Sequence, residues 1–269
     1  TEAQILPWTG EVGDDVDAIV ATGWETAYPS FRSSSPARRF YFVQDFEPWF
    51  TAVGTSSVLA EATYRFGFQG ITAGGWLAHK LQTEFGMPTA PFDFGADREH
   101  YHLMPGITRD EVFFYARAAT ERRGYDLGIL ALDLVSKARP DVTINLVGEA
   151  IRPETVPFTH VNIANIGIDQ LGAIYNRSVA ALVLSFTNLS LLPLELLSAG
   201  TIPVVNDGPN NRMVIDNPNI SWAPAVPAAL AEAILEVLDR PDRDAMAARA
   251  AASTADADWA RSGRQMLDA

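Results

Sequence analysis

The side chains best suited to chemistry fall in two short segments of the second half of the chain. In the first segment, Arg117 follows an apolar run, and Arg122 and Arg123 lie in the loop before the next helical stretch. Guanidinium groups match phosphate oxygens in pairs and keep their charge at every working pH. Positive charge at a helix start is unfavourable, so a bound anion explains these arginines better than a solvated surface patch does.

The second segment is the turn from Thr187 to Ser190 with the short helix that follows it. Two apolar runs, 180–184 and 201–205, are typical of buried parallel strands and flank this segment. Backbone N–H groups at the helix start favour bound phosphate, and Glu195, the only charge on the helix, could accept from a pair of ligand hydroxyls. The alternative is that Ser190 merely caps the helix and Glu195 points to solvent. The functional interpretation predicts a pocket for a nucleoside diphosphate.

Alternating strands and helices must position both segments. In the first half the patterns predict strands at 17–21, 38–45, 70–74 and 90–95, helices at 55–66 and 76–85, and a loop between the first two strands. In the second half they predict strands at 111–117, 142–148, 180–185 and 201–205, helices at 125–138, 168–178 and 227–240, a variable connection around 160–165, and helix from 243 onward.

This alternation predicts an α/β fold with two Rossmann-like parallel-sheet domains, of which the N-terminal one is short and incomplete. The polar stretch 96–110 contains Pro105-Gly106 and is the expected linker, with the boundary near residue 108. Ligands of open parallel sheets lie outside the carboxyl ends of the strands. Both chemical segments are therefore expected to converge on one crevice.

Composition narrows the functional class. The 269 residues carry a formal net charge of −13, which argues against nucleic acid and anionic lipid as general partners. With no cysteine, thiol catalysis and disulfides are excluded. No apolar run reaches the roughly 18 residues of a spanning helix, so we expect no membrane span and a cytoplasmic location. The oligomeric state is left undetermined.

Several segments, in order, resemble one known family. The segment FYARAATERRG, a strand ending in LVGE, and LGAIYNRSVAALVLSFTNLSLLPLELLSAGTIPVV resemble the donor half of retaining GT-B glycosyltransferases. The resemblance is closest to the bacterial rhamnosyltransferase branch of surface-polysaccharide assembly. In the first half, FYFVQDFEPWF, LAEATYRFGFQGITAGGWLAHKL and FDFGADREHYH are similar to the acceptor side of that branch. The resemblance spans residues 17–262.

The resemblance implies a GT-B fold with an acceptor-side domain at 1–108, a nucleotide-sugar domain at 109–250, and a C-terminal helix at 251–269 that crosses back to the first domain. It implies transfer of a hexosyl group, rhamnose from dTDP-rhamnose, to a glycan acceptor with retention of configuration. The nucleotide sugar is then a substrate, and neither a cofactor nor a metal is expected.

The resemblance also assigns roles to residues. Arg117 and Arg123 match the basic pair that neutralises the donor diphosphate, and Glu195 matches the second glutamate of an E-x7-E motif that holds the ribose. Thr187 occupies the place of the missing first glutamate. The implied donor contacts are Arg122, Gly148, Ile166, Gly167, Thr187, Asn188, Ser190 and Leu191. The implied acceptor-side residues are Gln44, Asp45 and Glu47, although Asp45 and Glu47 could equally be structural turn residues.

Other motifs carry less weight. Asp14-Asp15-Val16-Asp17 resembles a metal-binding D-x-D but precedes a strand, and His100 and His102 have no evident third ligand. The chain has no G-x-G-x-x-G after a strand and no P-loop motif, which removes the main support for dinucleotide oxidoreductases and P-loop enzymes. Two other functions stay open: a noncatalytic carbohydrate-binding or scaffold module derived from such an enzyme, and a nucleotide-sugar isomerase.

Overall fold

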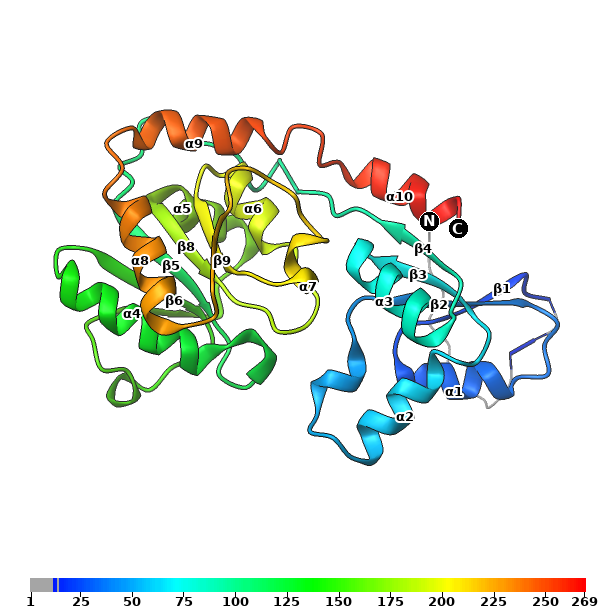
Figure 1. Cartoon of the computed structure of the whole chain (residues 1–269). Coiled ribbons are helices and arrows are strands. Elements are labelled where there is room, and N and C mark those ends of the chain that lie inside the picture. The colour runs from blue at the N-terminus through cyan, green and yellow to red at the C-terminus, as the bar shows by residue number, and fades with distance from the viewer. Residues whose placement is uncertain (1–11, 14) are drawn as a thin grey trace. The chain divides into compact units, whose positions relative to one another are not determined.

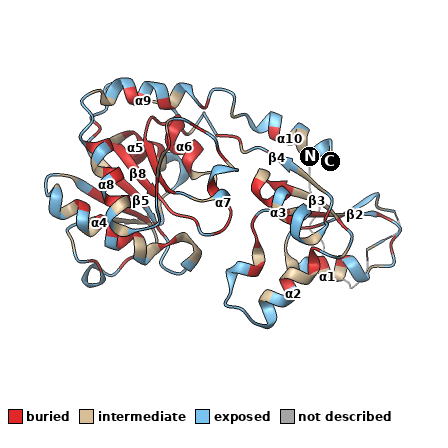
Figure 2. Cartoon of the chain, in the orientation of Figure 1, coloured by how far each residue is buried: buried red, intermediate tan, exposed pale blue. Residues whose placement is uncertain are grey.

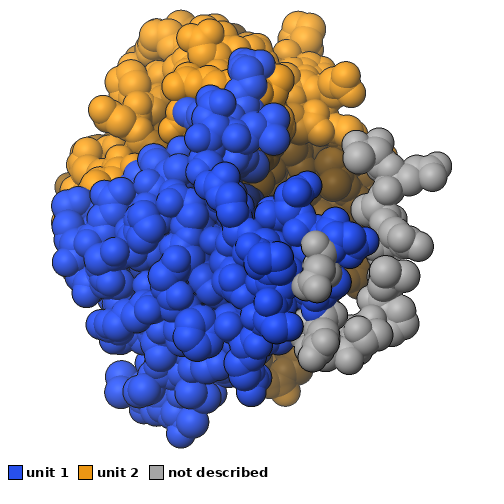
Figure 3. Space-filling model, turned by 90° about the vertical axis from the view of Figure 1, so that its right-hand side faces the viewer, with its two compact units in different colours: residues 1–92, 264–269 blue, residues 93–263 orange. Residues whose placement is uncertain are grey.

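The computed structural model describes residues 12–13 and 15–269, and the chain divides into two compact units (Figures 1 and 3). Unit 1 extends to Phe92 and includes Arg264–Ala269, whereas unit 2 comprises Asp93–Gly263. Each unit has its own parallel sheet.

In unit 1, parallel strands form a four-stranded sheet in the order β1-β2-β3-β4. The strands are β1 (Ala18–Ala21), β2 (Arg38–Val43), β3 (Gln69–Ala73) and β4 (Thr89–Phe92). The helices are α1 (Trp24–Arg32), α2 (Thr55–Thr63), α3 (Gly75–Phe85) and the 3-10 helix η1 (Glu47–Phe50). The four strands predicted in the first half are thus all present.

Helix α1 lies where the sequence predicted a loop. Pro29, inside this helix, cannot donate a backbone hydrogen bond and is normally a helix breaker. The helix forms nevertheless because its first turn is held from outside: the Trp24 N–H donates to the Glu47 carboxylate at 2.7 Å. The Gly23 carbonyl also accepts from the N–H groups of Thr26 and Ala27. A partner 23 residues away cannot be recognised from local pattern.

Unit 2 is built on a six-stranded parallel sheet in the order β10-β9-β8-β5-β6-β7. The strands are β5 (Glu111–Ala116), β6 (Thr143–Gly148), β7 (Val161–Ala164), β8 (Ser178–Val183), β9 (Ile202–Asn206) and β10 (Ser221–Ala223). The edge strands β7 and β10 were not predicted, since three or four residues carry too little periodicity. Reading from the middle outward, this is the doubly wound Rossmann order, with the switch of direction between β5 and β8.

Helices cover both faces of the second sheet. The α-helices of the second half are α4 (Tyr125–Ala138), α5 (Ile168–Arg177), α6 (Leu192–Ser198), α7 (Pro209–Arg212), α8 (Pro227–Leu238), α9 (Arg243–Ala252) and α10 (Trp259–Leu267), and the 3-10 helices are η2 (Glu121–Arg123) and η3 (Pro153–Thr155). Strands β8 and β9 are buried along their whole length (Figure 2).

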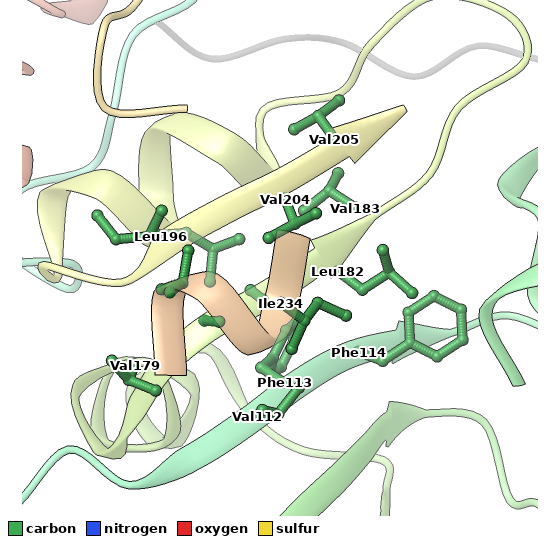
Figure 4. Close-up of a cluster of buried hydrophobic side chains, with 14 of the residues drawn as sticks. Val112, Phe113, Phe114, Val179, Leu182, Val183, Leu196, Val204, Val205 and Ile234 are labelled. Atoms are coloured by element: carbon green, nitrogen blue, oxygen red, sulfur yellow. The ribbon is translucent and has the colours of Figure 1, made fainter. Parts of the chain in front are cut away.

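The core of unit 2 explains which helix covers which face. Phe114 points toward α4, where its ring occupies the space beside Gly128, and Ile234 of α8 joins the same cluster (Figure 4). Phe113 points to the opposite face, and its ring meets that of Tyr175 on α5 edge to face at 5.1 Å. Neighbouring residues of a strand point to opposite faces, so β5 supports both layers.

The division between the units lies at Phe92, sixteen residues before the boundary expected near residue 108. The intervening stretch packs on unit 2, where the Tyr101 ring lies 5.4 Å from that of Tyr175. The buried Arg109 donates to Asn176 Oδ1 and to the Ala199 carbonyl, both at 2.7 Å. Polarity and a Pro-Gly pair predict an irregular backbone, but they do not reveal which unit it contacts.

None of the helices formed by the described residues combines the length and the apolar character needed to cross a membrane.

Candidate functional site

A small pocket lies at the carboxyl ends of β5 and β8, the two strands at which the connections of the second sheet change direction. Its volume is about 80 Å³. The lining residues are Phe114, Tyr115, Arg117, Arg123, Leu182, Val183, Leu184, Ser190 and Leu192. The switch point of a doubly wound sheet is the general location of ligand sites in this class of fold.

Two arginines from different elements share this pocket. Arg117 comes directly after β5, and its Cζ lies 5.7 Å from the centre of the Tyr115 ring. Arg123 closes η2, and its Nη1 donates to Ser185 Oγ at 2.7 Å and to the Asn188 carbonyl at 3.0 Å. Both of these acceptors are uncharged, and the two bonds orient the guanidinium.

The turn after β8 is held by amide side chains. Asn206 brackets Ser185: its Oδ1 accepts from the Ser185 N–H at 2.8 Å, and its Nδ2 donates to the Ser185 carbonyl at 2.9 Å. The Asn210 Nδ2 donates to the Thr187 carbonyl at 2.6 Å, and Asn211 donates to the Ser185 and Asn206 carbonyls. Satisfied networks of this kind rigidify a loop.

The fixed turn exposes some of its residues and buries others. Thr187 and Asn188 are 1% and 2% exposed, whereas Ser190 lines the pocket and Leu191 is half-buried at the start of α6. The missing first glutamate of the motif therefore corresponds to a side chain inside the protein. Of the polar turn residues predicted to contact the donor, Ser190 is the one that the structure places at the pocket.

Gly124 allows the arginine loop to approach this turn. Its φ of 63° lies in the left-handed region, which a residue with a side chain rarely adopts. A Cβ at this position would lie 3.0 Å from Leu184 Cδ1 and from Phe186 Cε2. In addition, the Phe186 N–H donates to the Arg122 carbonyl at 3.0 Å. Glycine thus permits the contact that brings Arg123 against the turn.

Glu195 lies one turn along α6 in a group of aromatic residues. The Tyr175 hydroxyl donates to Glu195 Oε2 at 3.3 Å, and the buried Tyr175 ring packs on Tyr101. Burial raises the pKa of Glu195 above its ordinary value, and the Tyr175 hydrogen bond partly opposes the shift. Burial, followed by the charge of Glu195, raises the pKa of Tyr101 to about 12. Glu195 is not among the lining residues of the pocket.

The remaining predicted donor residues lie at the ends of neighbouring elements. Arg122 is in η2, Gly148 ends β6 with a φ of 123°, and Ile166 and Gly167 precede α5. Ile166 packs partly into the core, while the space around Gly167 is open. These residues do not line the pocket described above, and their assigned contacts stay predictions.

The predicted acceptor-side residues belong to unit 1. Gln44 is exposed after β2, and the buried Asp45 accepts from the Phe46 N–H at 2.8 Å through its Oδ1. Glu47 accepts from the Trp24 N–H and so caps α1. Burial raises the pKa of Glu47 above its ordinary value, partly offset by this hydrogen bond. Asp45 and Glu47 therefore have partners within unit 1, and Glu47 begins the 3-10 helix η1 where the structural alternative expected an extended linker. Their acceptor-side roles stay predictions.

No group of three or more histidine, aspartate or glutamate side chains suited to a metal ion occurs within 12–13 and 15–269. Asp14 of the D-x-D segment lies outside the described residues. His100 instead bridges two carboxylates: its Nδ1 lies 2.9 Å from Asp97 Oδ2 and its Nε2 lies 3.1 Å from Asp169 Oδ1.

Sequence reasoning missed two groups of residues at this site. One is the amide network of Asn206, Asn210 and Asn211, which follows β9 and holds a turn some twenty residues earlier. The other consists of Tyr101 and Tyr175 around Glu195 and of Tyr115 in the pocket. Tyr115 carried a usable signal, because it is a polar aromatic residue at the end of a strand that is otherwise apolar after Glu111.

Residues 110–235 match the family model described as WsaF, C-terminal domain. The chain is also similar to the O-antigen biosynthesis protein RfbC of Myxococcus xanthus, with 36% identity over 205 residues. This match covers 74% of the chain but only 16% of RfbC, so the chain spans a small part of that curated relative.

Solved structures resemble the chain over both units. Sucrose-phosphate synthase of Thermosynechococcus elongatus matches with a TM-score of 0.72 and 14% identity, covering 94% of this chain and 71% of that one. HepE of Anabaena, solved in complex with UDP and glucose, matches with a TM-score of 0.75 and 14% identity, covering 95% and 77%. The pneumococcal O-GlcNAc transferase GtfA, in complex with UDP and GlcNAc, matches with a TM-score of 0.68 and 13% identity, covering 93% and 55%. The predicted GT-B-like fold is confirmed.

Proposed function

We propose that this chain is a nucleotide-sugar-dependent glycosyltransferase of polysaccharide biosynthesis. One observation carries the proposal: Arg117, Arg123 and Ser190, which come from separate segments, line one pocket at the switch point of the second sheet. The similarity to RfbC, an O-antigen biosynthesis protein, supports a role in polysaccharide biosynthesis. The likeness to HepE in complex with UDP and glucose supports a nucleoside diphosphate sugar as the donor.

The chemistry follows from the charge that develops in the reaction. When the glycosidic bond to the donor diphosphate breaks, negative charge builds up on the departing phosphate oxygens. Two guanidinium groups held in advance by protein contacts stabilise that charge more in the transition state than in the ground state. Arg123 is held in this way by Ser185 and by the turn carbonyl of Asn188. In our proposal these cations take the role of a metal ion.

We further propose that the sugar is rhamnose carried by dTDP, that the anomeric configuration is retained, and that a glycan is the acceptor. Glu195 would accept from the ribose hydroxyls, and Arg117 and Arg123 would contact the diphosphate. These finer assignments rest on the resemblance of the donor half to rhamnosyltransferases and on the pairing of the two arginines in one pocket.

Calorimetric titration of the protein with dTDP and UDP tests the proposed donor site. We expect wild type to bind a nucleoside diphosphate and Arg123→Ala to bind it about 5- to 150-fold more weakly, the effect of losing about 1 to 3 kcal/mol of hydrogen bonding to a charged group. Arg249→Ala is the control, because Arg249 is half-exposed, forms an ion pair with Asp242 and does not line the pocket.

Absence of binding by wild type, or undiminished binding by Arg123→Ala, would contradict the proposal. Slow release of dTDP from dTDP-rhamnose without acceptor, unaffected by EDTA, would support a working metal-independent site. Binding without any release would favour the noncatalytic module instead. Appearance of an epimerised nucleotide sugar would favour an isomerase.

A further inference from the structure

Tyr115 is an exposed aromatic residue that the diphosphate chemistry does not use. It is the penultimate residue of β5 and is 38% exposed. Phe113, which precedes it on the same face of the strand, is fully buried against Tyr175. Core packing therefore accounts for the aromatic side chain of Phe113. The ring of Tyr115 instead lies beyond the core and lines the pocket with Arg117 and Arg123.

The backbone of β6 leaves room for the Tyr115 ring. Gly148 pairs with Ala116 in the sheet and has a φ of 123°. A Cβ on Gly148 would lie 2.9 Å from Tyr115 Cε2 and 3.3 Å from its Cδ2, closer than side chains normally approach. On another side, the Arg117 guanidinium lies 5.7 Å from the ring centre. Two neighbours thus restrict the ring while part of its surface stays open.

The tyrosine also lies between the two ends of the predicted ligand. Arg117 and Arg123 share the pocket with Tyr115 and would hold the diphosphate. Toward Glu195, the ring of Phe113, two residues earlier on the same face of β5, lies 5.1 Å from that of Tyr175, whose hydroxyl donates to Glu195. Tyr115 therefore adjoins both the arginines and the group that contains Glu195.

We propose that the ring of Tyr115 is the surface against which the nucleoside half of the donor packs, between the arginine pair and Glu195. This inference rests on the proposed function and adds to it a contact for the nucleoside half of the donor. An aromatic face contributes to nucleoside binding through apolar contact and stacking, and it does not discriminate strongly between bases. Free pyrophosphate would contact the arginines but not this ring.

The test compares ligands with and without a nucleoside on the full chain. Wild type, Tyr115→Ala and Tyr115→Phe are titrated calorimetrically with dTDP, UDP and inorganic pyrophosphate. We expect Tyr115→Ala to bind dTDP and UDP about 5- to 100-fold more weakly. Its pyrophosphate affinity should stay at the wild-type value, which also shows that the variant is folded. Tyr115→Phe should bind all three ligands as wild type does, because it keeps the ring.

Trp222→Ala is the matched control, since the Arg212 Cζ lies 4.6 Å from the Trp222 ring in a similar arginine–aromatic pair that does not line the pocket. It should bind every ligand as wild type does. Unchanged dTDP affinity in Tyr115→Ala overturns this inference alone. Equal loss of pyrophosphate affinity also overturns it, as does a loss in Tyr115→Phe as large as in Tyr115→Ala. Failure of wild type to bind either nucleotide overturns the proposed function and this inference together.

Discussion

Among single residues, Glu195 shows best how the fold changes a side chain. Its carboxylate is half-buried beside Tyr175 and Tyr101, and burial raises its pKa even though the Tyr175 hydroxyl donates to it. A buried acid without a cationic partner costs free energy when it is charged. Residues that destabilise the fold but serve a ligand are typical of functional sites.

Glu195→Gln is therefore expected to stabilise the protein and to weaken nucleotide binding. Between the ordinary pKa of glutamate and the raised pKa of Glu195, the folded state binds more protons than the unfolded state. The free energy of unfolding then falls as pH rises through that window, and the penalty is fully present above the raised pKa. Thermal melting should give a higher Tm for the variant at pH 7 and a smaller difference at pH 4.

In calorimetric titration the same variant should bind dTDP about tenfold or more weakly, because a neutral amide is a poorer acceptor for ribose hydroxyls than a carboxylate. A lower Tm at pH 7 would show that the charged form of Glu195 is stabilised in the fold. Unchanged dTDP affinity would separate Glu195 from the donor site.

At the scale of elements, close contacts between helices and strands decide the geometry of the site. Helix α4 begins after the arginine loop and packs along β5, whose end carries Tyr115 and Arg117. Gly128, inside this helix, makes the packing possible, because a Cβ there would lie 2.3 Å from Phe114 Cζ. The position of Arg123 thus depends on a glycine one helical turn into α4.

Gly128→Ala is expected to destabilise the protein by about 1 to 3 kcal/mol, the usual cost of overpacking a core. Without such a close contact, alanine in a helix stabilises a protein by up to about 1 kcal/mol relative to glycine. The sign of the measured change in unfolding free energy therefore tests whether position 128 packs against Phe114. Urea unfolding measures it. Gly263→Ala in α10 is the matched control: the space around Gly263 is open, and this variant should be slightly more stable than wild type. Equal effects of both substitutions would contradict the packing argument.

For the whole molecule, the important fact is that the chain forms two units with separate sheets (Figure 3). The arginines, the turn with Ser190 and Glu195 all belong to unit 2, while Gln44, Asp45 and Glu47 belong to unit 1. A ligand that binds the folded form of one unit stabilises that unit directly by mass action.

We expect dTDP at 100 times its Kd to stabilise unit 2 by about 2.7 kcal/mol, which raises its melting temperature by about 5–10 °C. Differential scanning calorimetry measures the shift, and Gly128→Ala identifies the transition of unit 2 because it lowers that transition. Arg123→Ala should show a much smaller shift at the same dTDP concentration. A transition that moves with dTDP but not with Gly128→Ala would place the nucleotide site in unit 1.

The sequence alone predicted the structure correctly where a short-range pattern of residues determines it. The apolar spacing of residues 125–138 predicted α4 with the bounds that the structure shows, and the runs before Arg117 and before the Ser190 turn predicted buried parallel strands. Parallel strands end at the same edge of a sheet, so the meeting of Arg117 and Arg123 with Ser190 followed from topology alone.

Only the tertiary structure decided which side chains are buried and what they contact. It placed Thr187 and Asn188 inside the protein, put Tyr115 in the pocket and Tyr175 against Glu195, joined residues 93–109 to unit 2, and formed α1 around Pro29. Each outcome depends on partners about 20 to 100 residues away, such as Glu47 for Trp24 or Asn210 for Thr187. Periodicity reports which face of an element is apolar, whereas burial and hydrogen bonding are properties of the packed chain.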